Sequence, residues 1–280
     1  MRERVPVSLE MNRFAADIQR IPAPLQAGAK ELVLTMANWS DPRPAASAFQ
    51  VNRAGVRTEA YDAGLRRYML SVYNYMASGV LLTGIVALLF AQSGAAAQVF
   101  FSPGLLKYAI MFAPLAFVLV LSFGIHRLST GAAQALFWLF ATVMGLSMST
   151  IFLVYTGPSI AITFFAAASA FLALSIYGYT TKRDLSGLGT FLIMGVVGLI
   201  VASLLNLWFQ SPGFNLVISA VGVLLFAGLT AYDTQRIKSM YDWVQGSDMM
   251  GKVVIMGALS LYLDFVNMFQ FLLSFLGNRE

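Results

Sequence analysis

The sequence of 280 residues contains no cysteine and only one histidine, His126. Without cysteine there is no disulfide framework, no thiolate metal site and no cysteine nucleophile. A single histidine cannot form a zinc site of the clustered-histidine type. These two absences exclude most metal and nucleophile chemistry, and we therefore predict neither an enzyme nor a bound cofactor.

Charged residues are also scarce, at 11% of the chain, which is less than half of their usual share in a soluble domain. Hydrophobic residues make up 58%, and the mean hydropathy is +0.72. Such a composition excludes a soluble protein with polar surfaces all round. It also excludes a disordered or nucleic-acid-binding chain, despite the net charge of +5. It predicts a membrane protein that crosses the bilayer several times.

The charges that are present concentrate in residues 1–67, which hold ten basic and seven acidic residues and five of the nine prolines. We interpret this stretch as a cytoplasmic, largely disordered basic tail, with short helices near Met11–Ile21 and Leu25–Met36. Each proline disfavours helix at the residue before it, so these helices stay short. No apolar run of signal-peptide length follows the arginines, so we do not expect a cleaved leader.

Residues 68–280 contain long apolar runs instead, and no acidic residue lies between Asp62 and Asp184. A membrane-spanning helix needs about 20 apolar residues, and in lipid only a helix satisfies its own backbone groups. The sequence therefore predicts an all-α polytopic domain with seven transmembrane helices. The expected segments are Tyr68–Ala91, Leu105–Phe123, Ala132–Tyr155, Ile160–Tyr177, Gly187–Phe209, Phe214–Tyr232 and Val253–Leu276.

The distribution of lysine and arginine predicts the orientation, because basic residues gather on the cytoplasmic side. With the N-terminus in the cytoplasm, sixteen of the eighteen basic residues fall on that side. The exceptions are Lys107 and Arg279. An odd number of spans then places the C-terminus in the periplasm.

Two acidic residues interrupt the apolar segments, and an ionisable residue inside a span is a functional candidate by default. Asp264 lies within the last segment, and Asp233 lies at the end of the sixth. Ser260, Asp264 and Asn267 are spaced by four and three residues, so they share one face of a helix. A helix with one polar stripe in so apolar a chain is expected at the centre of the bundle.

Whether the two acids meet depends on where the last helix enters the membrane. A start at Val253 puts Asp264 about 17 Å deep, out of reach of Asp233 at the rim. A start at Leu259 puts it only about 8 Å deep, within reach of Asp233.

If the two carboxylates meet in poorly hydrated surroundings, they cannot both ionise cheaply and would share a proton. The pair Asp233 and Asp264 is then a proton sensor, a site for a hard cation such as Ca²⁺, or both. Two simpler interpretations stay open: Asp233 neutralises Arg236, and Asp264 makes a structural hydrogen bond to another span. A pore would also need polar lining in the periplasmic half, where the sequence offers little beyond Ser203, Asn206 and Ser219.

Three stretches match motifs of a known family: residues 258–269 (ALSLYLDFVNMF), 230–235 (TAYDTQ), and 72–76 (VYNYM) with 82–84 (LTG). With them, residues 60–278 resemble the Bax inhibitor-1 family, also called the transmembrane BAX inhibitor motif proteins, which has bacterial members of the YccA type. The resemblance implies a seven-helix bundle in which the other six helices surround the last. Residues before about 55 resemble no family that we can name.

The resemblance also implies two functions. Some bacterial members are pH-sensitive calcium leaks whose sensor is an aspartate pair, matching Asp233 and Asp264. A basic residue at the inner end of the second helix closes that pair, and alignment puts His126 there with Arg127 beside it. The first hypothesis is therefore a pH-sensitive calcium or cation leak in the bacterial inner membrane. The alternative is a non-conducting regulator that binds a membrane-bound AAA protease or a stress-response partner, as other members do.

Overall fold

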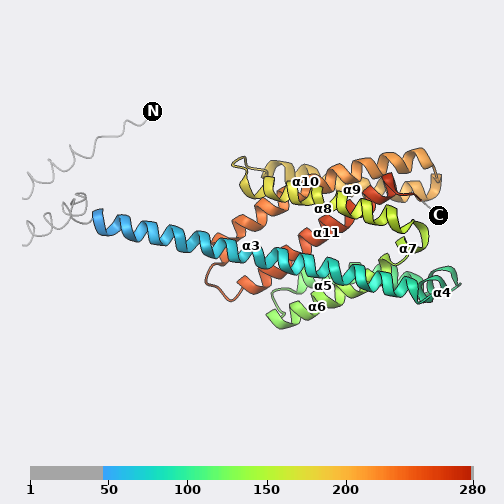
Figure 1. The fold of residues 1–280 in the computed structure, drawn as a ribbon, viewed down its shortest axis with the longest axis horizontal. Coiled ribbons are helices and arrows are strands. Elements are labelled where there is room, and N and C mark those ends of the chain that lie inside the picture. The colour runs from blue at the N-terminus through green and yellow to red at the C-terminus, as the bar shows by residue number, and fades with distance from the viewer. Residues whose placement is uncertain (1–46, 279–280) are drawn as a thin grey trace, which may run out of the picture. The chain divides into compact units, whose positions relative to one another are not determined.

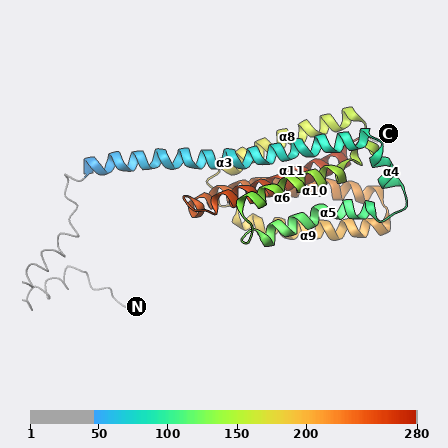
Figure 2. The ribbon, with the colours of Figure 1, turned by 90° about the horizontal axis from the view of Figure 1, so that it is seen from below.

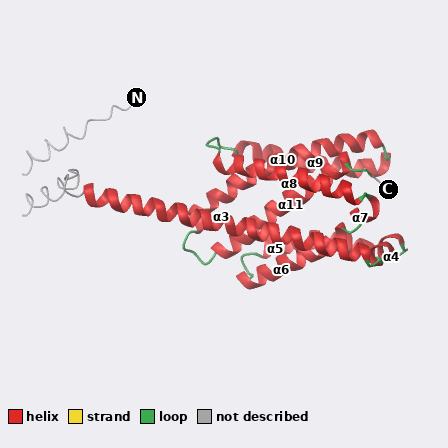
Figure 3. Ribbon diagram, viewed as in Figure 1, coloured by secondary structure: helices red, strands yellow, loops and turns green. Residues whose placement is uncertain are grey.

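A computed structural model describes residues 47–278, which form helices joined by short links, with no strand among them (Figure 1 and Figure 3). The helices are α3 (Ser47–Gln92), α4 (Ala95–Phe101), α5 (Leu106–Gly124), α6 (Thr130–Met148), α7 (Ile151–Val154), α8 (Gly157–Thr180), α9 (Ser186–Phe209), α10 (Pro212–Val244) and α11 (Met250–Leu276).

Seven of the helices in this described part are long and apolar enough to cross a membrane, as the sequence predicts. Beyond shifts of a few residues, the helices differ from the expected segments in three places, of which the early start of α3 is described below. The third expected segment is divided into α6 and the single turn α7. The sixth, expected to end at Tyr232, continues as α10 to Val244. Hydropathy falls after Tyr232, but no proline or glycine follows before Val244, so nothing in the local sequence ends the helix.

Helix α3 runs without a break through Arg67, where the expected tail meets the expected membrane domain. The last part of that tail, from Ser47, is therefore helical. The short helices expected earlier in the tail lie outside the described residues. The contacts divide the chain into two units, residues 1–62 and 63–280, and the fold described below is that of the second unit.

Helix α11 lies at the centre of this second unit, packed against α10, α8 and α6 (Figure 1 and Figure 2). In its most apolar stretch 67% of the residues are buried, against 11% in α5 and 17% in α9. It also contacts α3, because the hydroxyl groups of Thr83 and Tyr262 are hydrogen-bonded at 2.7 Å. The prediction of a central last helix is thus confirmed. Helix α5 packs chiefly on α6, and helix α9 packs chiefly on α10. Helices α5 and α9 therefore form an outer layer.

The bundle has two ends of different character (Figure 1). At one end lie the links 125–129, 181–185 and 245–249, and we call it the basic end because Arg127, Lys182, Arg183 and Lys252 lie in or beside them. At the other lie α4, α7 and residues 277–278, and we call it the C-terminal end. Lys107 is its only basic residue among the described part of the chain.

Candidate functional site

Contacts near both ends of α10 and α11 fix the antiparallel register of the two helices. Toward the C-terminal end, the Ser219 hydroxyl donates a hydrogen bond to the Ser274 hydroxyl at 3.0 Å. Toward the basic end, the side chain of Ile237 lies against Gly257, where a Cβ atom would come within 3.2 Å of it. Because these contacts keep the same spacing along both helices, they also determine which residues lie level between them.

In this register Asp233 of α10 lies level with Ser260 of α11, whose hydroxyl group acts on the Asp233 carboxyl group. Asp264 follows Ser260 by four residues, so it lies about 6 Å further along α11 toward the C-terminal end. The charged group that acts on Asp264 is Asp233. The structure therefore brings the two predicted acids into one neighbourhood, with Ser260 beside them.

The place of Asp233 beside Ser260 follows from the length and packing of α10. Helix α11 is continuous from Met250 and runs through both Val253 and Leu259. Helix α10, however, continues eleven residues beyond Asp233, so this acid lies inside a helix and is half-buried. Hydropathy falls after Tyr232, but the helix and its packing continue to Val244.

Asp264 is the more deeply buried acid, with 5% of its side chain exposed. Its Oδ2 atom is buried and has no hydrogen-bond partner. A buried carboxylate needs a proton, a cation or hydrogen bonds to offset lost hydration, and here its charged neighbour has the same sign. The arrangement can therefore accept a proton or a cation at this position.

Asp233 lies between this buried acid and the basic end. Arg236, one turn later in α10, is the cation that acts on it, and its side chain is exposed. Asp233 therefore has a cation on one side and Ser260 and Asp264 on the other. Behind it, the Thr234 and Ser175 hydroxyl groups are hydrogen-bonded at 3.1 Å, which ties α10 to α8 at the same level.

The predicted closing residues His126 and Arg127 lie in the link between α5 and α6, and both are exposed. Neither is among the charged groups that act on Asp233 or Asp264. The structure therefore places Arg236 where the sequence proposed one of these two. Closure of the pair by Arg127 or His126 stays a prediction, and it would require the link to approach the pair.

The polar stripe of α11 divides into two roles. Ser260 acts on the Asp233 carboxyl group, whereas the Asn267 amide donates to the Leu263 carbonyl of its own helix at 2.7 Å. Asn267 therefore makes its hydrogen bond within its own helix, and Ser260 is the residue of the stripe that acts on the acid pair.

The donor set at the pair suits a passing ion better than a resident one. Among the residues that the structure describes, no three histidine, cysteine, aspartate or glutamate side chains gather in one place. Ca²⁺ takes six to eight oxygen ligands, and Asp233, Asp264 and Ser260 together provide fewer. Water would have to complete the shell, so any cation held here would be held weakly.

Polar lining exists toward the C-terminal end, but not where the sequence indicated it. The Ser203 hydroxyl donates to the Leu199 carbonyl within α9, and the Asn206 side chain accepts from the Ser211 backbone. Both residues are in the outer layer. Ser219 is bonded to Ser274, as described above.

A cavity of about 320 Å³ near the C-terminal end is instead lined by Ser147, Thr150, Tyr155 and Gln270, together with apolar side chains. Gln270 lies six residues beyond Asp264 on α11, about 9 Å along the helix. A glutamine in an apolar span was the one available signal for this cavity. Its other polar residues come from α6 and the residues around α7, and only packing brings them to it.

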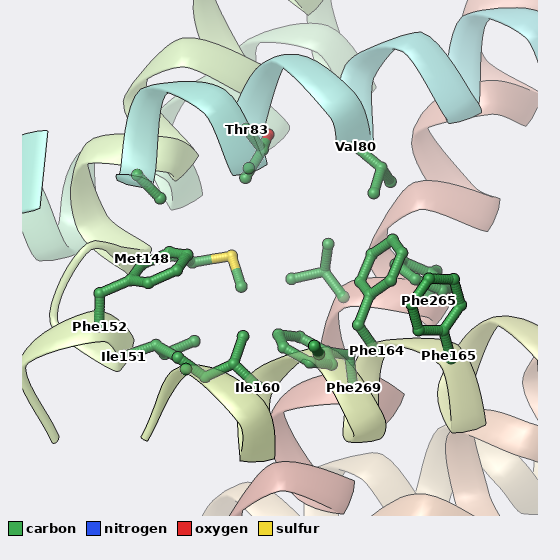
Figure 4. A pocket seen from close by; sticks show the side chains of 15 residues that line it. Val80, Thr83, Met148, Ile151, Phe152, Ile160, Phe164, Phe165, Phe265 and Phe269 are labelled. Atoms are coloured by element: carbon green, nitrogen blue, oxygen red, sulfur yellow. The ribbon is translucent and has the colours of Figure 1, made fainter. Parts of the chain in front are cut away.

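A second cavity, of about 350 Å³, lies between α3, α6, α8 and α11 and is almost entirely apolar (Figure 4). Phenylalanines of α8 and α11 line it, among them Phe164, Phe265 and Phe269. Its polar side chain, Thr83, donates to the Ala141 carbonyl at 2.8 Å and is bonded to Tyr262. This cavity has no free polar group that could replace the water around an ion.

The fold and this site define a class: an all-helical, multi-span membrane protein with a buried acid, Asp264, in its central helix and a second acid, Asp233, in the helix beside it. The sequence model described as inhibitor of apoptosis-promoting Bax1 matches residues 65–280. The chain therefore belongs to the Bax inhibitor-1 family, whose description names an inhibitor and no catalytic activity.

Relatives in several bacteria agree with this assignment. The chain is 48% identical over 225 residues to an uncharacterized protein of Rickettsia prowazekii, covering 80% of this chain and 94% of that one. It is 46% identical over 220 residues to the inner membrane protein YbhL of Escherichia coli, covering 78% and 94%. A protein of Caulobacter vibrioides is 46% identical over 234 residues, covering 78% and 92%.

Proposed function

We propose that the protein is a pH-sensitive leak for calcium and similar cations in the bacterial inner membrane, gated by Asp233 and Asp264. One observation carries the proposal: a carboxylate oxygen of Asp264 is buried in the central helix without a partner, beside a second acid. An ionisable group in that position is costly, and such groups mark ion and proton pathways. The membrane assignment rests on the seven apolar helices and on the relative described as an inner membrane protein.

In this proposal the charge of the pair decides whether a cation can pass. With a shared proton, the pair holds less negative charge and the two carboxyl groups do not repel each other. When the proton leaves, the two carboxylates repel each other and attract a cation. A cation that passes the pair reaches the cavity beside Gln270, whose side chain offers oxygen. Weak binding at both places is what conduction requires.

Calcium flux into liposomes that contain the purified full-length protein tests this function. We expect entry above that of protein-free liposomes, with a rate that changes between about pH 5 and 8, where a shared carboxyl proton or a histidine titrates. A calcium-sensitive dye inside the vesicles reports the rate. Absence of flux at every pH would refute conduction, and regulation of a membrane-bound AAA protease would take its place.

The orientation is a separate prediction, from the distribution of basic residues. Because basic links stay in the cytoplasm, we expect the basic end there and the C-terminus in the periplasm. A reporter that is active only in the periplasm should work when fused after Glu280 and fail when fused after Gly246. Activity of the second fusion and silence of the first would reverse the orientation.

A further inference from the structure

The basic end contains a third cavity, of about 390 Å³, between the link 181–185 and α10. Three cations line it: Lys182 and Arg183 from the link and Arg236 from α10. Asp184 is the one acid in its lining. Hydrogen bonds from Ser186 hold the pKa of Asp184 below its usual value, so its charge stays constant over the physiological range. The lining therefore keeps an excess of two positive charges.

The cavity is built by packing and hydrogen bonds. The side-chain oxygen of Gln235 accepts from the Leu185 backbone at 2.8 Å, and its amide donates to the Arg183 carbonyl at 2.8 Å. These two bonds fix the link against α10. The Tyr232 ring, which also lines the cavity, lies on Gly189 of α9, so close that no Cβ atom would fit there.

Lys238, near the cavity, differs from the cavity cations because its ammonium group is held by neighbouring groups of the protein. The Lys238 ammonium group donates to the Tyr179 carbonyl at 2.8 Å and lies 4.6 Å from the centre of the Tyr179 ring. It thus stabilises the end of α8 and does not line the cavity. Lys182, Arg183 and Arg236 are exposed and directed at a shared space.

The surface beside the cavity is apolar from the first turns of α9. Helix α9 starts at Ser186, and Leu188 and Phe191 in its first turns are 53% and 67% exposed. In a spanning helix such side chains face lipid. A molecule with an anionic head and apolar tails would therefore meet cations at the cavity and an apolar surface along α9.

We propose that this cavity binds the phosphate-bearing headgroup of an anionic phospholipid, with its acyl chains along α9. Basic pockets at the ends of spanning helices provide the charge that such headgroups need. Arginine in particular binds phosphate oxygens in a bidentate manner.

Bound lipid would also affect the acid pair. This effect rests on the proposed function, whereas the binding of lipid does not. Arg236 both lines the cavity and acts on Asp233. A headgroup phosphate therefore competes with Asp233 for the same guanidinium group. Anionic lipid is thus expected to release Asp233 from its cation and to shift the pH range over which the leak opens.

Binding is tested by the thermal stabilisation of the detergent-solubilised full chain with short-chain phosphatidylglycerol or phosphatidylcholine. We expect saturable stabilisation by phosphatidylglycerol alone. Replacing Lys182, Arg183 or Arg236 by Gln should weaken it about fivefold per charge removed. Lys252→Gln, which removes an equal charge at the same end but outside the cavity, should leave it unchanged.

Two results would overturn the site: equal stabilisation by the two lipids, or an equal loss in Lys252→Gln and the three cavity variants. If inorganic phosphate or glycerol phosphate stabilised the protein as much as phosphatidylglycerol does, the ligand would be a soluble phosphate and the lipid assignment would be wrong. The cavity variants carry exposed substitutions, and their melting without lipid shows that they fold. Calcium flux in liposomes with and without phosphatidylglycerol then tests the competition for Arg236. Selective binding with an unshifted pH profile would overturn that competition alone.

Discussion

Liposomes containing the Asp264→Asn protein are expected to lose the pH dependence of calcium entry between about pH 5 and 8. Asparagine has nearly the shape of aspartate but cannot ionise, so the buried pair no longer exchanges a shared proton. The bundle should still form, because an amide without a partner at this position replaces a carboxylate that already lacks one at Oδ2. The initial rate of calcium entry across the pH series measures the effect.

Three further variants make this result specific. Asp233→Asn should have a similar effect, and the double variant should add little, because residues that act as one unit are not additive. Asp248→Asn removes the same charge from the exposed link 245–249 and should keep the pH dependence. If Asp248→Asn and Asp264→Asn behaved alike, total charge rather than the pair would control the flux.

The same measurement identifies the basic residue that closes the pair. The resemblance indicates His126 and Arg127, whereas the cation that acts on Asp233 in the structure is Arg236, which the sequence offered as the simpler partner. The three Gln variants can be compared one at a time. Loss of pH sensitivity in Arg127→Gln, with its retention in His126→Gln, would identify Arg127 as the closing residue in a state where the link 125–129 approaches the pair. Loss only in Arg236→Gln would assign closure to the residue already beside it.

Seven spans could be predicted from the sequence because each needs only a long apolar run, which is a local property. The central place of α11 was also predictable, since one helix alone carried Ser260, Asp264 and Asn267 on a single face. Whether Asp233 and Asp264 meet was not predictable. That depends on the register of α10 against α11, which contacts at other residues of the two helices determine, among them Ser219 with Ser274 and Ile237 with Gly257.

The polar cavity and the cationic cavity were missed for a related reason. Gln270 and Thr150 are far apart in the sequence, and so are Arg183 and Arg236. Gln270 stands out in its apolar span, but nothing in the local sequence of any of these residues shows its partner in the cavity. Only the packing of α6 on α11, and of the link 181–185 on α10, brings them to one place.

Gly178→Val is expected to destabilise the bundle strongly, because α8 approaches the backbone of α10 closely at this glycine. A Cβ atom there would overlap the carbonyl oxygen of Ala231 in α10, which is backbone and cannot rotate away. Inserting atoms into a packed interface costs about 1–3 kcal/mol. For a domain of this size, that is a fall of about 2–12 °C in Tm. Thermal unfolding in detergent, followed by circular dichroism, measures it.

Gly198→Val is the matched control, since this glycine also lies within a spanning helix but has no neighbour within 4 Å of its Cβ position. Its Tm should change little. The Gly178 substitution should also disturb the acid pair, because it lies one turn from Ser175, whose hydroxyl bonds to Thr234 beside Asp233. Moving α8 away from α10 breaks that bond and removes a contact that holds the Asp233 segment of α10 in place. A Gly178→Val protein that melts like Gly198→Val and keeps its pH-dependent flux would show that α8 does not hold Asp233 in place.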